Sequence, residues 1–364
     1  MRKILSLALC ILLLFSIVGC SGSQSEPSSE PDIEDPNAYL TDLFHGIYVL
    51  EERDGAYGDA KIGGGSFVPL RFSRDRLADY DSYNKTAKIK APYYECTTGV
   101  RMDFYTDAQS ISFDYTVTAS FGDTNPDCPI DTFNIYENGE FKASQQVKKS
   151  EKNTLVYTPT SADAENRITI LFPNYHGVAL SRFELGNTRP VTDYSHKILV
   201  LGDSISQGLY ADKPADAYVH QVATALNADY MNLSVGGEIY REEALDEDVH
   251  FNPTHIIVAL GTNDYYAGIS PSKLKSNATS YLQKLKEIYP DVSVTVISPF
   301  GNFPLNYHQS IEQAAISMGY DFVNGTTLIS QYVSSWNNDQ IHPCSVGFNE
   351  ITAALTPILQ QKLS

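Results

Sequence analysis

The second half of the chain alternates short apolar runs with stretches of helical character, and this alternation constrains the fold more than any other feature. The apolar runs lie at 197–201, 229–233, 255–260, 292–298 and 320–324, and the helical stretches at 216–227, 272–288, 307–318 and 346–361. Parallel strands need a crossover, usually a helix, to bring the chain back to the start of the next strand. The pattern therefore predicts an α/β domain over residues 194–364, with helices on both faces of a parallel sheet.

Small and polar residues follow two of these predicted strands. Gly202-Asp203-Ser204 comes directly after the first strand, and Gly261-Thr262-Asn263-Asp264 after the third. Ligands of open parallel sheets bind outside the carboxyl ends of the strands, so we expect Ser204 and Asn263 to share that edge. Each motif alone also has a plain structural explanation, because turns favour Gly, Asp and Ser, and Asn commonly caps a helix.

A third motif, Asp339-Gln340-Ile341-His342-Pro343, lies near the C-terminus. A histidine beside a proline is by itself an ordinary surface feature. A serine hydroxyl, however, is a weak nucleophile until a base takes its proton and a third group orients that base. Ser204, His342 and Asp339 supply these three groups, and Asn263 with backbone N–H groups can receive the developing oxyanion. The three motifs together predict a serine esterase.

These blocks resemble the SGNH (GDSL) hydrolase superfamily, whose nucleophile follows Gly-Asp and whose Asp-x-x-His lies near the C-terminus. The resemblance implies a three-layer αβα, flavodoxin-like domain. It implies that Ser204 is the nucleophile, that His342 is the general base and then the acid, and that Asp339 orients His342. It also implies an oxyanion hole made of the backbone N–H groups of Ser204 and Gly237 and the side-chain amide of Asn263.

The block that contains Gly237 departs from the pattern of the family. The family often shows Asn-Leu-Gly-x-Ser-Gly, whereas this chain has Asn-Leu-Ser-Val-Gly-Gly at 232–237. Alignment makes Gly237 the donor, with Gly236 where a small residue usually lies, and a flexible turn is the alternative. The chain has no Gly-x-Ser-x-Gly motif, which argues against an ordinary α/β-hydrolase.

The first half of the chain has a different pattern of short alternating runs broken by Gly, Pro, Asn and Asp. Residues 111–117 alternate cleanly, and Asn138-Gly139 indicates a hairpin turn. Many short strands at this spacing predict a β-sandwich over residues 38–188. Segments 97–104 and 171–178 are similar to a jelly-roll-like domain that precedes some bacterial SGNH esterases, a layout shared by two-domain carbohydrate esterases that deacetylate plant polysaccharides.

The N-terminus reads as a targeting segment. Two basic residues precede an apolar run that ends in Ile17-Val18-Gly19-Cys20, which resembles the bacterial lipobox. The resemblance implies removal of residues 1–19 and a lipid on Cys20, with residues 20–37 as a disordered tether; a plain secretory signal is the alternative. Acyl chains would anchor the protein at the bacterial cell surface without spanning the membrane.

Charge and cysteines narrow the range of partners. The formal net charge is −18, and it falls to about −20 once the leader is removed. So acidic a surface argues against nucleic acid and against highly anionic substrates. Cys96, Cys128 and Cys344 form no closed disulfide framework, and pairing of the first two stays open. No metal-binding motif occurs, so neither a metal nor a cofactor is implied.

Two aromatic residues near the motifs are candidates for substrate binding. Tyr265 follows Asn263, and Trp336, the only tryptophan, precedes Asp339 by three residues. They could stack on a sugar ring, and packing in the core or a loop is the alternative. Together, the motifs and resemblances predict a surface esterase that removes short acyl groups, acetyl above all, from carbohydrate through an acyl-enzyme. The alternatives are an acyltransferase to a glycan acceptor and a glycan-binding lipoprotein with a vestigial hydrolase domain.

Overall fold

The computed structural model describes residues 38–53, 65–84, 91–121, 130–149, 152–161, 164–245 and 249–363. Residues 39–364 form one compact unit, so the predicted domain boundary near residue 190 stays a prediction. The predicted leader, Cys20 with its tether, and Cys128 lie outside the described residues. Within the described ranges, no helix combines the length and the apolar character needed to cross a membrane.

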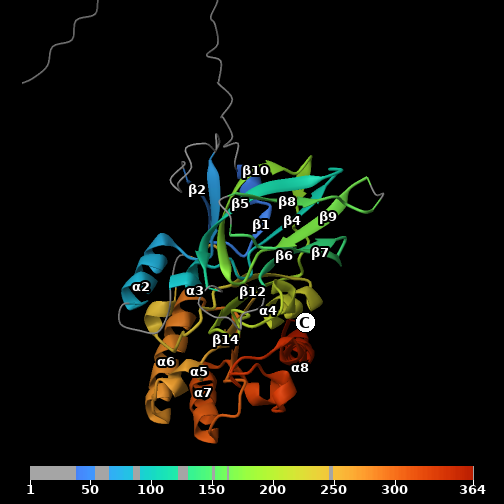
Figure 1. The fold of residues 1–364 in the computed structure, drawn as a ribbon. Coiled ribbons are helices and arrows are strands. Elements are labelled where there is room, and N and C mark those ends of the chain that lie inside the picture. The colour runs from blue at the N-terminus through green and yellow to red at the C-terminus, as the bar shows by residue number, and fades with distance from the viewer. Residues whose placement is uncertain are drawn as a thin grey trace, which may run out of the picture. The chain divides into compact units, whose positions relative to one another are not determined.

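A parallel five-stranded sheet organises the second half of the chain (Figure 1). Its strands lie in the order β13-β12-β14-β15-β16, which is the flavodoxin-like order, and every neighbouring pair is parallel. The strands are β12 (His196–Gly202), β13 (Ala228–Asn232), β14 (His255–Ala259), β15 (Ser293–Ile297) and β16 (Asp321–Val323). All five lie within two residues of the predicted apolar runs, which confirms the α/β prediction.

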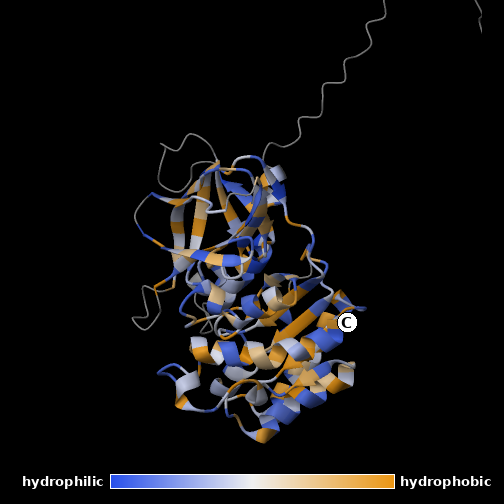
Figure 2. Ribbon diagram, turned by 90° about the vertical axis from the view of Figure 1, so that its right-hand side faces the viewer, coloured by the Kyte–Doolittle hydropathy of each residue, from blue (hydrophilic) through white to orange (hydrophobic). Residues whose placement is uncertain are grey.

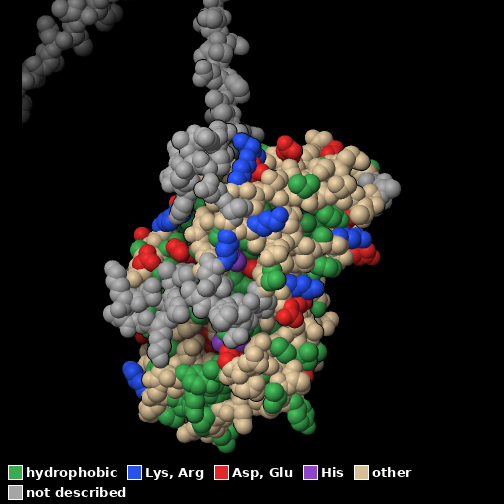
Figure 3. Space-filling view, in the orientation of Figure 1, with side chains coloured by type: hydrophobic (Ala, Val, Ile, Leu, Met, Phe, Trp, Pro, Cys, Tyr) green, Lys and Arg blue, Asp and Glu red, His purple; other side chains and the backbone are tan. Residues whose placement is uncertain are grey.

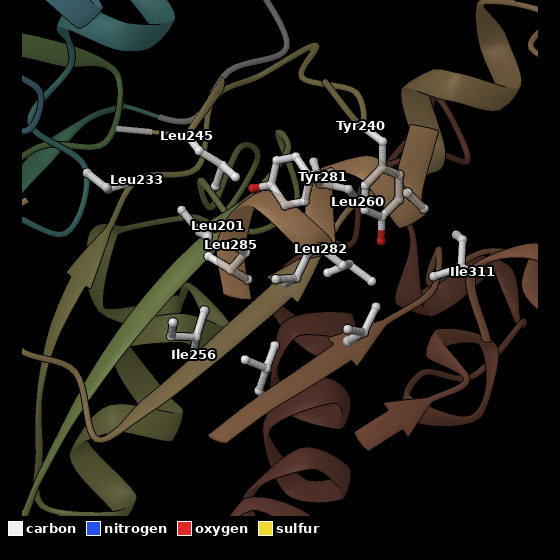
Figure 4. Packing of buried hydrophobic residues seen from close by; sticks show 14 of the residues in the cluster. Leu201, Leu233, Tyr240, Leu245, Ile256, Leu260, Tyr281, Leu282, Leu285 and Ile311 are labelled. Atoms are coloured by element: carbon white, nitrogen blue, oxygen red, sulfur yellow. The ribbon is translucent and has the colours of Figure 1, made fainter. Parts of the chain in front are cut away.

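Helices cover both faces of this sheet. Successive strand residues point to opposite sides, so each strand contributes side chains to a core on either face. Ile256 and Leu282 belong to one buried core (Figure 4), whereas Ile257 belongs to a second core with Leu355. Burial on both faces explains why these strands are mostly apolar at successive positions, as at residues 198–201 and 256–259, and Figure 2 colours them mostly as hydrophobic. The helices are α4 (Tyr218–Ala225), α5 (Thr262–Tyr266), α6 (Pro271–Ile288), α7 (Leu305–Met318) and α8 (Ser345–Leu363).

Two antiparallel sheets make up the N-terminal β-rich region. One has the order β1-β4-β9-β6-β7 with β11 paired to β4, and the other has the order β2-β3-β10-β5-β8. Phe104 and Phe133 of the first sheet share a buried core with Phe113 and Leu180 of the second. The strands are β1 (Phe44–His45), β2 (Val49–Arg53), β3 (Ser66–Leu70), β4 (Arg101–Thr106), β5 (Ile111–Ser120), β6 (Thr132–Glu137), β7 (Glu140–Gln146), β8 (Asn153–Tyr157), β9 (Asn166–Leu171), β10 (His176–Glu184) and β11 (Thr188–Pro190).

The hairpin predicted at Asn138-Gly139 is confirmed. It joins β6 to β7 in a two-residue turn that pairs Glu137 with Glu140. Both turn residues have positive φ, 53° at Asn138 and 81° at Gly139. A type I′ turn needs positive φ at both positions, which is why Asn-Gly marks such hairpins.

Three short helices were not predicted from the sequence: α1 (Ala38–Thr41), α2 (Arg74–Asn84) and α3 (Ala91–Glu95). Tyr80 of α2 stacks on Tyr94 of α3 at 5.0 Å between ring centroids, and both rings belong to the core on the α6 face of the parallel sheet. Helix α2 shows no apolar stripe in the sequence, because it is mostly polar and is held by a few aromatic side chains.

A buried ion pair joins the β-rich region to the parallel sheet. Arg101 of β4 bonds the carboxylate of Asp229 on β13 and also donates to the Tyr230 carbonyl at 3.1 Å. Burial raises the pKa of Asp229, but Arg101 and His45 lower it further, to about 2. The carboxylate is therefore charged at neutral pH and holds the two parts of the chain together.

Candidate active site

The structure brings together the three residues predicted as nucleophile, base and orienting acid. Ser204 lies in the turn after β12, and His342 lies in the loop before α8, 138 residues later. The Nε2 atom of His342 is 2.8 Å from the Ser204 Oγ, and its Nδ1 atom is 2.6 Å from the Asp339 Oδ2. This continuous series has the geometry by which a base and its orienting group activate a hydroxyl.

The turn after β12 holds Ser204 rigidly at the carboxyl edge of the sheet. The Oδ1 of Asp203 accepts the N–H of Ile205 at 3.0 Å, and the Ser204 carbonyl accepts the N–H of Leu209 at 3.0 Å. A Cβ on Gly202 would come within 2.5 Å of the Ser206 Oγ, so the residue that ends the strand has to be glycine. Ser204 itself is 6% exposed, which leaves its hydroxyl little freedom.

Asp339 fixes both the orientation and the proton of the His342 ring. Its Oδ1 accepts the backbone N–H groups of Ile341 at 2.9 Å and His342 at 3.0 Å, while Oδ2 faces the ring. Burial raises the pKa of Asp339, but these hydrogen bonds outweigh it and lower the pKa to about 2. A carboxylate at Nδ1 assigns the ring proton to that nitrogen and leaves Nε2 free to accept the proton of Ser204.

The predicted oxyanion donors lie on the loop after β13 and at the start of α5. The Gly236 N–H already donates to the Gln207 Oε1 at 2.7 Å, whereas within the described part of the chain the N–H groups of Gly237 and Ser204 have no acceptor. Gly237 has φ +89°, a conformation that L side chains rarely adopt. The Asn263 side chain donates to the Glu238 carbonyl at 3.0 Å, which ties it to the same loop. The catalytic roles of these residues stay predictions.

Two buried carboxyl groups lie beside these residues and were not part of the sequence prediction. Burial raises the pKa of Asp203 to about 6 and that of Asp264 to about 7. The Oδ2 of Asp264 accepts the Tyr240 N–H at 3.3 Å, and its Oδ1 has no hydrogen-bond partner among the described residues. These two groups change charge close to neutral pH within the structure that supports the site.

A cleft of about 440 Å³ adjoins the site, since Ile341, which precedes His342, is part of its wall. Its lining carries no charged side chain and consists of Tyr265, Tyr266, Gly301, Asn302, Phe303, Gln331, Trp336, Gln340 and Ile341. Tyr265 packs edge-on against Phe303, with 5.1 Å between ring centroids. Hydrophobic side chains gather over α5, α6 and α7 on the face shown in Figure 3.

Both aromatic residues singled out in the sequence line this cleft. Tyr265 is 38% exposed, whereas Trp336 is 8% exposed and donates its ring N–H to the Ser330 carbonyl at 2.8 Å. Trp336 therefore has a packing role as well as a place in the wall. Sequence reasoning missed Phe303, although it lies shortly after the carboxyl end of β15, where the same edge rule applies.

Comparison with known families gives a match in the second half of the chain. Residues 200–347 match the model of the GDSL-like Lipase/Acylhydrolase family. The matched segment contains Ser204, Gly237, Asn263, Asp339 and His342. A search of curated proteins found no match to this chain.

Solved structures with the same fold extend over most of the described chain. The salicylyl-acyltransferase SsfX3 from a tetracycline biosynthetic pathway is 16% identical, with 88% of this chain and 94% of that chain covered at a TM-score of 0.69. A protein described as a GDSL-like lipase from Bacteroides ovatus is 18% identical, with 89% and 96% covered at 0.66. The acetyl xylan esterase Est2A from Butyrivibrio proteoclasticus is 17% identical, with 75% and 92% covered at 0.56. At such identities the likeness shows the fold alone.

Proposed function

On the premise that residues 200–347 are a GDSL-like lipase/acylhydrolase domain, we propose that this chain is a serine esterase that removes short acyl groups, acetyl above all, from carbohydrate. The observation that carries the proposal is the hydrogen-bonded series Asp339–His342–Ser204, with 2.6 Å and 2.8 Å between its polar atoms. Folding does not require such a series beside an open cleft. An acyl transfer reaction does require one, because the serine must be activated where the substrate binds.

The proposed mechanism follows from the proton positions. Ser204 Oγ attacks the ester carbonyl while His342 Nε2 takes the hydroxyl proton, and the charged oxygen is received by the N–H groups of Ser204 and Gly237 and by the Asn263 amide. The bond to the alcohol oxygen then breaks, the His342 imidazolium protonates that oxygen, and the acyl group stays on Ser204. A water molecule deprotonated by His342 attacks the acyl-enzyme, the bond to Ser204 Oγ breaks, and His342 returns the proton to that oxygen as the acid is released.

The lining of the cleft supports an uncharged substrate with both apolar and hydroxyl-bearing faces. Tyr265, Tyr266 and Phe303 offer ring surfaces, and the amides of Gln331 and Gln340 offer donors and acceptors. Specific pockets commonly combine an aromatic wall with a few polar groups. A family two carbohydrate esterase from Clostridium thermocellum, solved with cellohexaose, and the acetyl xylan esterase Est2A share the fold, which further supports a carbohydrate ester.

Transfer of the acyl group to a second sugar is the alternative, and the likeness to a salicylyl-acyltransferase favours keeping it. The same acyl-enzyme would form, and an acceptor hydroxyl would replace water in the second step. Product analysis with and without an added oligosaccharide acceptor separates the two, because a hydrolase gives free acid in both cases.

We propose two further features of the chain as a whole. The first is that residues 38–188 pack as a jelly-roll-like β-sandwich, which the shared core of the two antiparallel sheets supports. The second is that residues 1–19 are removed and that Cys20 carries a lipid anchor at the bacterial cell surface. Expression in a bacterial host with Cys20→Ala, followed by membrane fractionation and mass spectrometry, tests the anchor; an unchanged membrane fraction would contradict it.

The esterase proposal is tested with the chain from residue 21 onward against p-nitrophenyl acetate, butyrate and octanoate, with Ser204→Ala as the control. We expect turnover of acetate that falls steeply with acyl length and is abolished in the variant, and release of acetate from acetylated oligosaccharides. A preference for octanoate would move the substrate class to lipids. Polysaccharide binding without serine-dependent turnover of any ester would leave a glycan-binding lipoprotein with a vestigial site.

A further inference from the structure

The side chain of Arg71, which directly follows β3 of the β-rich region, is buried against the loop after β13. Arg71 is 2% exposed, and within the described residues its side chain donates to four backbone carbonyls: Nε to Cys96 at 2.8 Å, Nη2 to Tyr93 at 2.9 Å, and Nη1 to Asn232 at 2.8 Å and Ser234 at 3.0 Å. Two of the acceptors lie at α3 and two lie in the block that leads to Gly237.

Burying the charged guanidinium of Arg71 costs free energy, so its position calls for an explanation. Among the described residues, the charge interactions of Arg71 are with Cys96 and Tyr80 and not with a carboxylate, and desolvation lowers the pKa of its guanidinium to about 10. A buried charge without a countercharge is retained only where its hydrogen bonds are well satisfied. The rigid fork of guanidinium donors is suited to holding several carbonyls at fixed angles, which a lysine ammonium cannot do.

Gln207 makes a second connection between the same two segments. It lies three residues after Ser204 and is fully buried. Its Nε2 donates to the Tyr93 carbonyl at 2.7 Å, and its Oε1 accepts the Gly236 N–H at 2.7 Å. The Tyr93 carbonyl therefore receives both Arg71 and Gln207. A Cβ on Gly236 would come within 2.9 Å of the Tyr93 ring, so α3 also packs directly on the loop.

Residues 233–237, named here the oxyanion loop, are thus held along their length up to the proposed donor. The Val235 N–H bonds the Gly202 carbonyl at 3.0 Å, which ties the loop to the strand that precedes Ser204. Arg71 holds the Ser234 carbonyl and Gln207 holds the Gly236 N–H, and the next N–H along the chain is that of Gly237. An oxyanion donor works only when it lies about 2.7–3.1 Å from the charged oxygen.

We infer that Arg71 and Gln207 are positioning residues for the oxyanion hole, which they set by anchoring the oxyanion loop to the Tyr93 segment of the β-rich region. Both side chains are buried, so we expect neither to contact substrate. The inference rests on the proposed function. It adds that the N-terminal region is needed for turnover in the hydrolase domain and is not only an attached binding module.

The test compares Arg71→Lys and Gln207→Met with Arg76→Lys as the matched control. Arg76 is also a buried arginine of the same region, 6% exposed, but it donates to the Leu245 carbonyl, which lies outside the oxyanion loop. With p-nitrophenyl acetate we expect kcat of the first two variants to fall tenfold or more, approaching the ~10²–10³ typical of a lost oxyanion donor. We expect KM to stay within about twofold, because the interaction is made in the transition state.

Phenylboronic acid gives a readout that does not depend on the natural substrate. Its boron accepts a lone pair of the Ser204 Oγ, the hydroxyl proton moves to His342, and one boron-bound oxygen lies in the oxyanion hole. We expect the affinity for this adduct to fall in Arg71→Lys and Gln207→Met in parallel with kcat, and to stay unchanged in Arg76→Lys. A purely structural role would lower the melting temperature in all three variants without separating them in affinity.

The outcomes are distinguishable. If Arg71→Lys does not fold, Gln207→Met decides. If kcat and boronate affinity of the folded variants match Arg76→Lys while Ser204→Ala abolishes turnover, the positioning inference is wrong and the esterase proposal stands. If the wild-type chain hydrolyses no ester but its boronate affinity depends on Arg71 and Gln207, the proposed function fails and the positioning inference stands.

Discussion

Replacing Asp339 with asparagine separates the charge and proton pattern of this residue from its size. In the structure, Oδ1 accepts the N–H groups of Ile341 and His342, so an asparagine would keep its carbonyl oxygen there. Its NH₂ group would then face the His342 Nδ1, where the Asp339 Oδ2 now lies at 2.6 Å. That nitrogen would have to accept a hydrogen bond, which places the ring proton on Nε2 and prevents it from taking the proton of Ser204.

The size of the effect follows from the proton position. A wrong tautomer in a Ser-His-Asp site costs about 10⁴ in turnover, which corresponds to about 5 kcal/mol in the barrier. Asp339→Ala should cost less than Asp339→Asn, since water can accept from Nδ1 and no donor faces the ring. Asp339 is one third exposed, so water can reach the space that alanine would leave.

The assay is steady-state hydrolysis of p-nitrophenyl acetate between pH 5 and 9, with Ser204→Ala as the background rate. Thermal melts of Asp339→Asn and Asp339→Ala show whether the variants are folded. Turnover of Asp339→Asn within tenfold of the wild type, or an alanine variant slower than the asparagine variant, would refute the assignment of Asp339 as the orienting acid.

Three further substitutions test other parts of the structure. Gly237→Ala places a side chain at φ +89°, a strain of about 1–2 kcal/mol, and relief of that strain should move the N–H; we expect kcat to fall at least tenfold, and an unchanged kcat would exclude this N–H as a donor. Asp264→Asn tests the buried carboxyl, whose folded pKa of about 7 lies above its unfolded value of ~3.9. The wild type therefore loses stability as pH rises from 4 to 7, and the variant does not. The melting temperature of the variant relative to wild type should rise across that window, and a constant difference would contradict the raised pKa. Asp229→Asn leaves the Arg101 charge buried against a neutral amide, and we expect a loss of about 3–5 kcal/mol in the free energy of unfolding in urea. Because the pKa of Asp229 is about 2 in the folded state, the stabilisation by its carboxylate is complete at neutral pH and is lost as pH falls from about 4 to 2. A variant as stable as wild type at pH 7 would refute this expectation.

The parallel sheet and its helices could be predicted because their signals are local. Strands buried on both faces are apolar at most successive positions, and a helix shows its apolar residues every three or four positions. The Asn138-Gly139 turn was equally clear, since few residue pairs adopt positive φ at two successive positions. Helix α2 carried no such signal, because its burial depends on Tyr80 meeting Tyr94 rather than on a repeating pattern.

The residues of the candidate site also divide into those that a local motif marks and those that it does not. Ser204, His342 and Asp339 could be proposed from their motifs, because the chemistry of a hydroxyl, an imidazole and a carboxylate is written in the residue types. Nothing in the sequence marked Arg71 or Gln207, whose hydrogen bonds go to main-chain atoms of residues far along the chain. A backbone carbonyl is present at every residue, so no pattern of side chains shows which one a buried donor will meet.

The sequence by itself determined the order of strands and helices and the set of reactive groups, since periodicity and side-chain chemistry depend on a residue and its near neighbours. Only the tertiary structure decided that His342 meets Ser204 across 138 residues, that an uncharged aromatic cleft adjoins them, and that an arginine of the β-rich region holds the oxyanion loop. These are distances between parts of the chain that the packing of the core brings together, and packing depends on all the contacting residues at once.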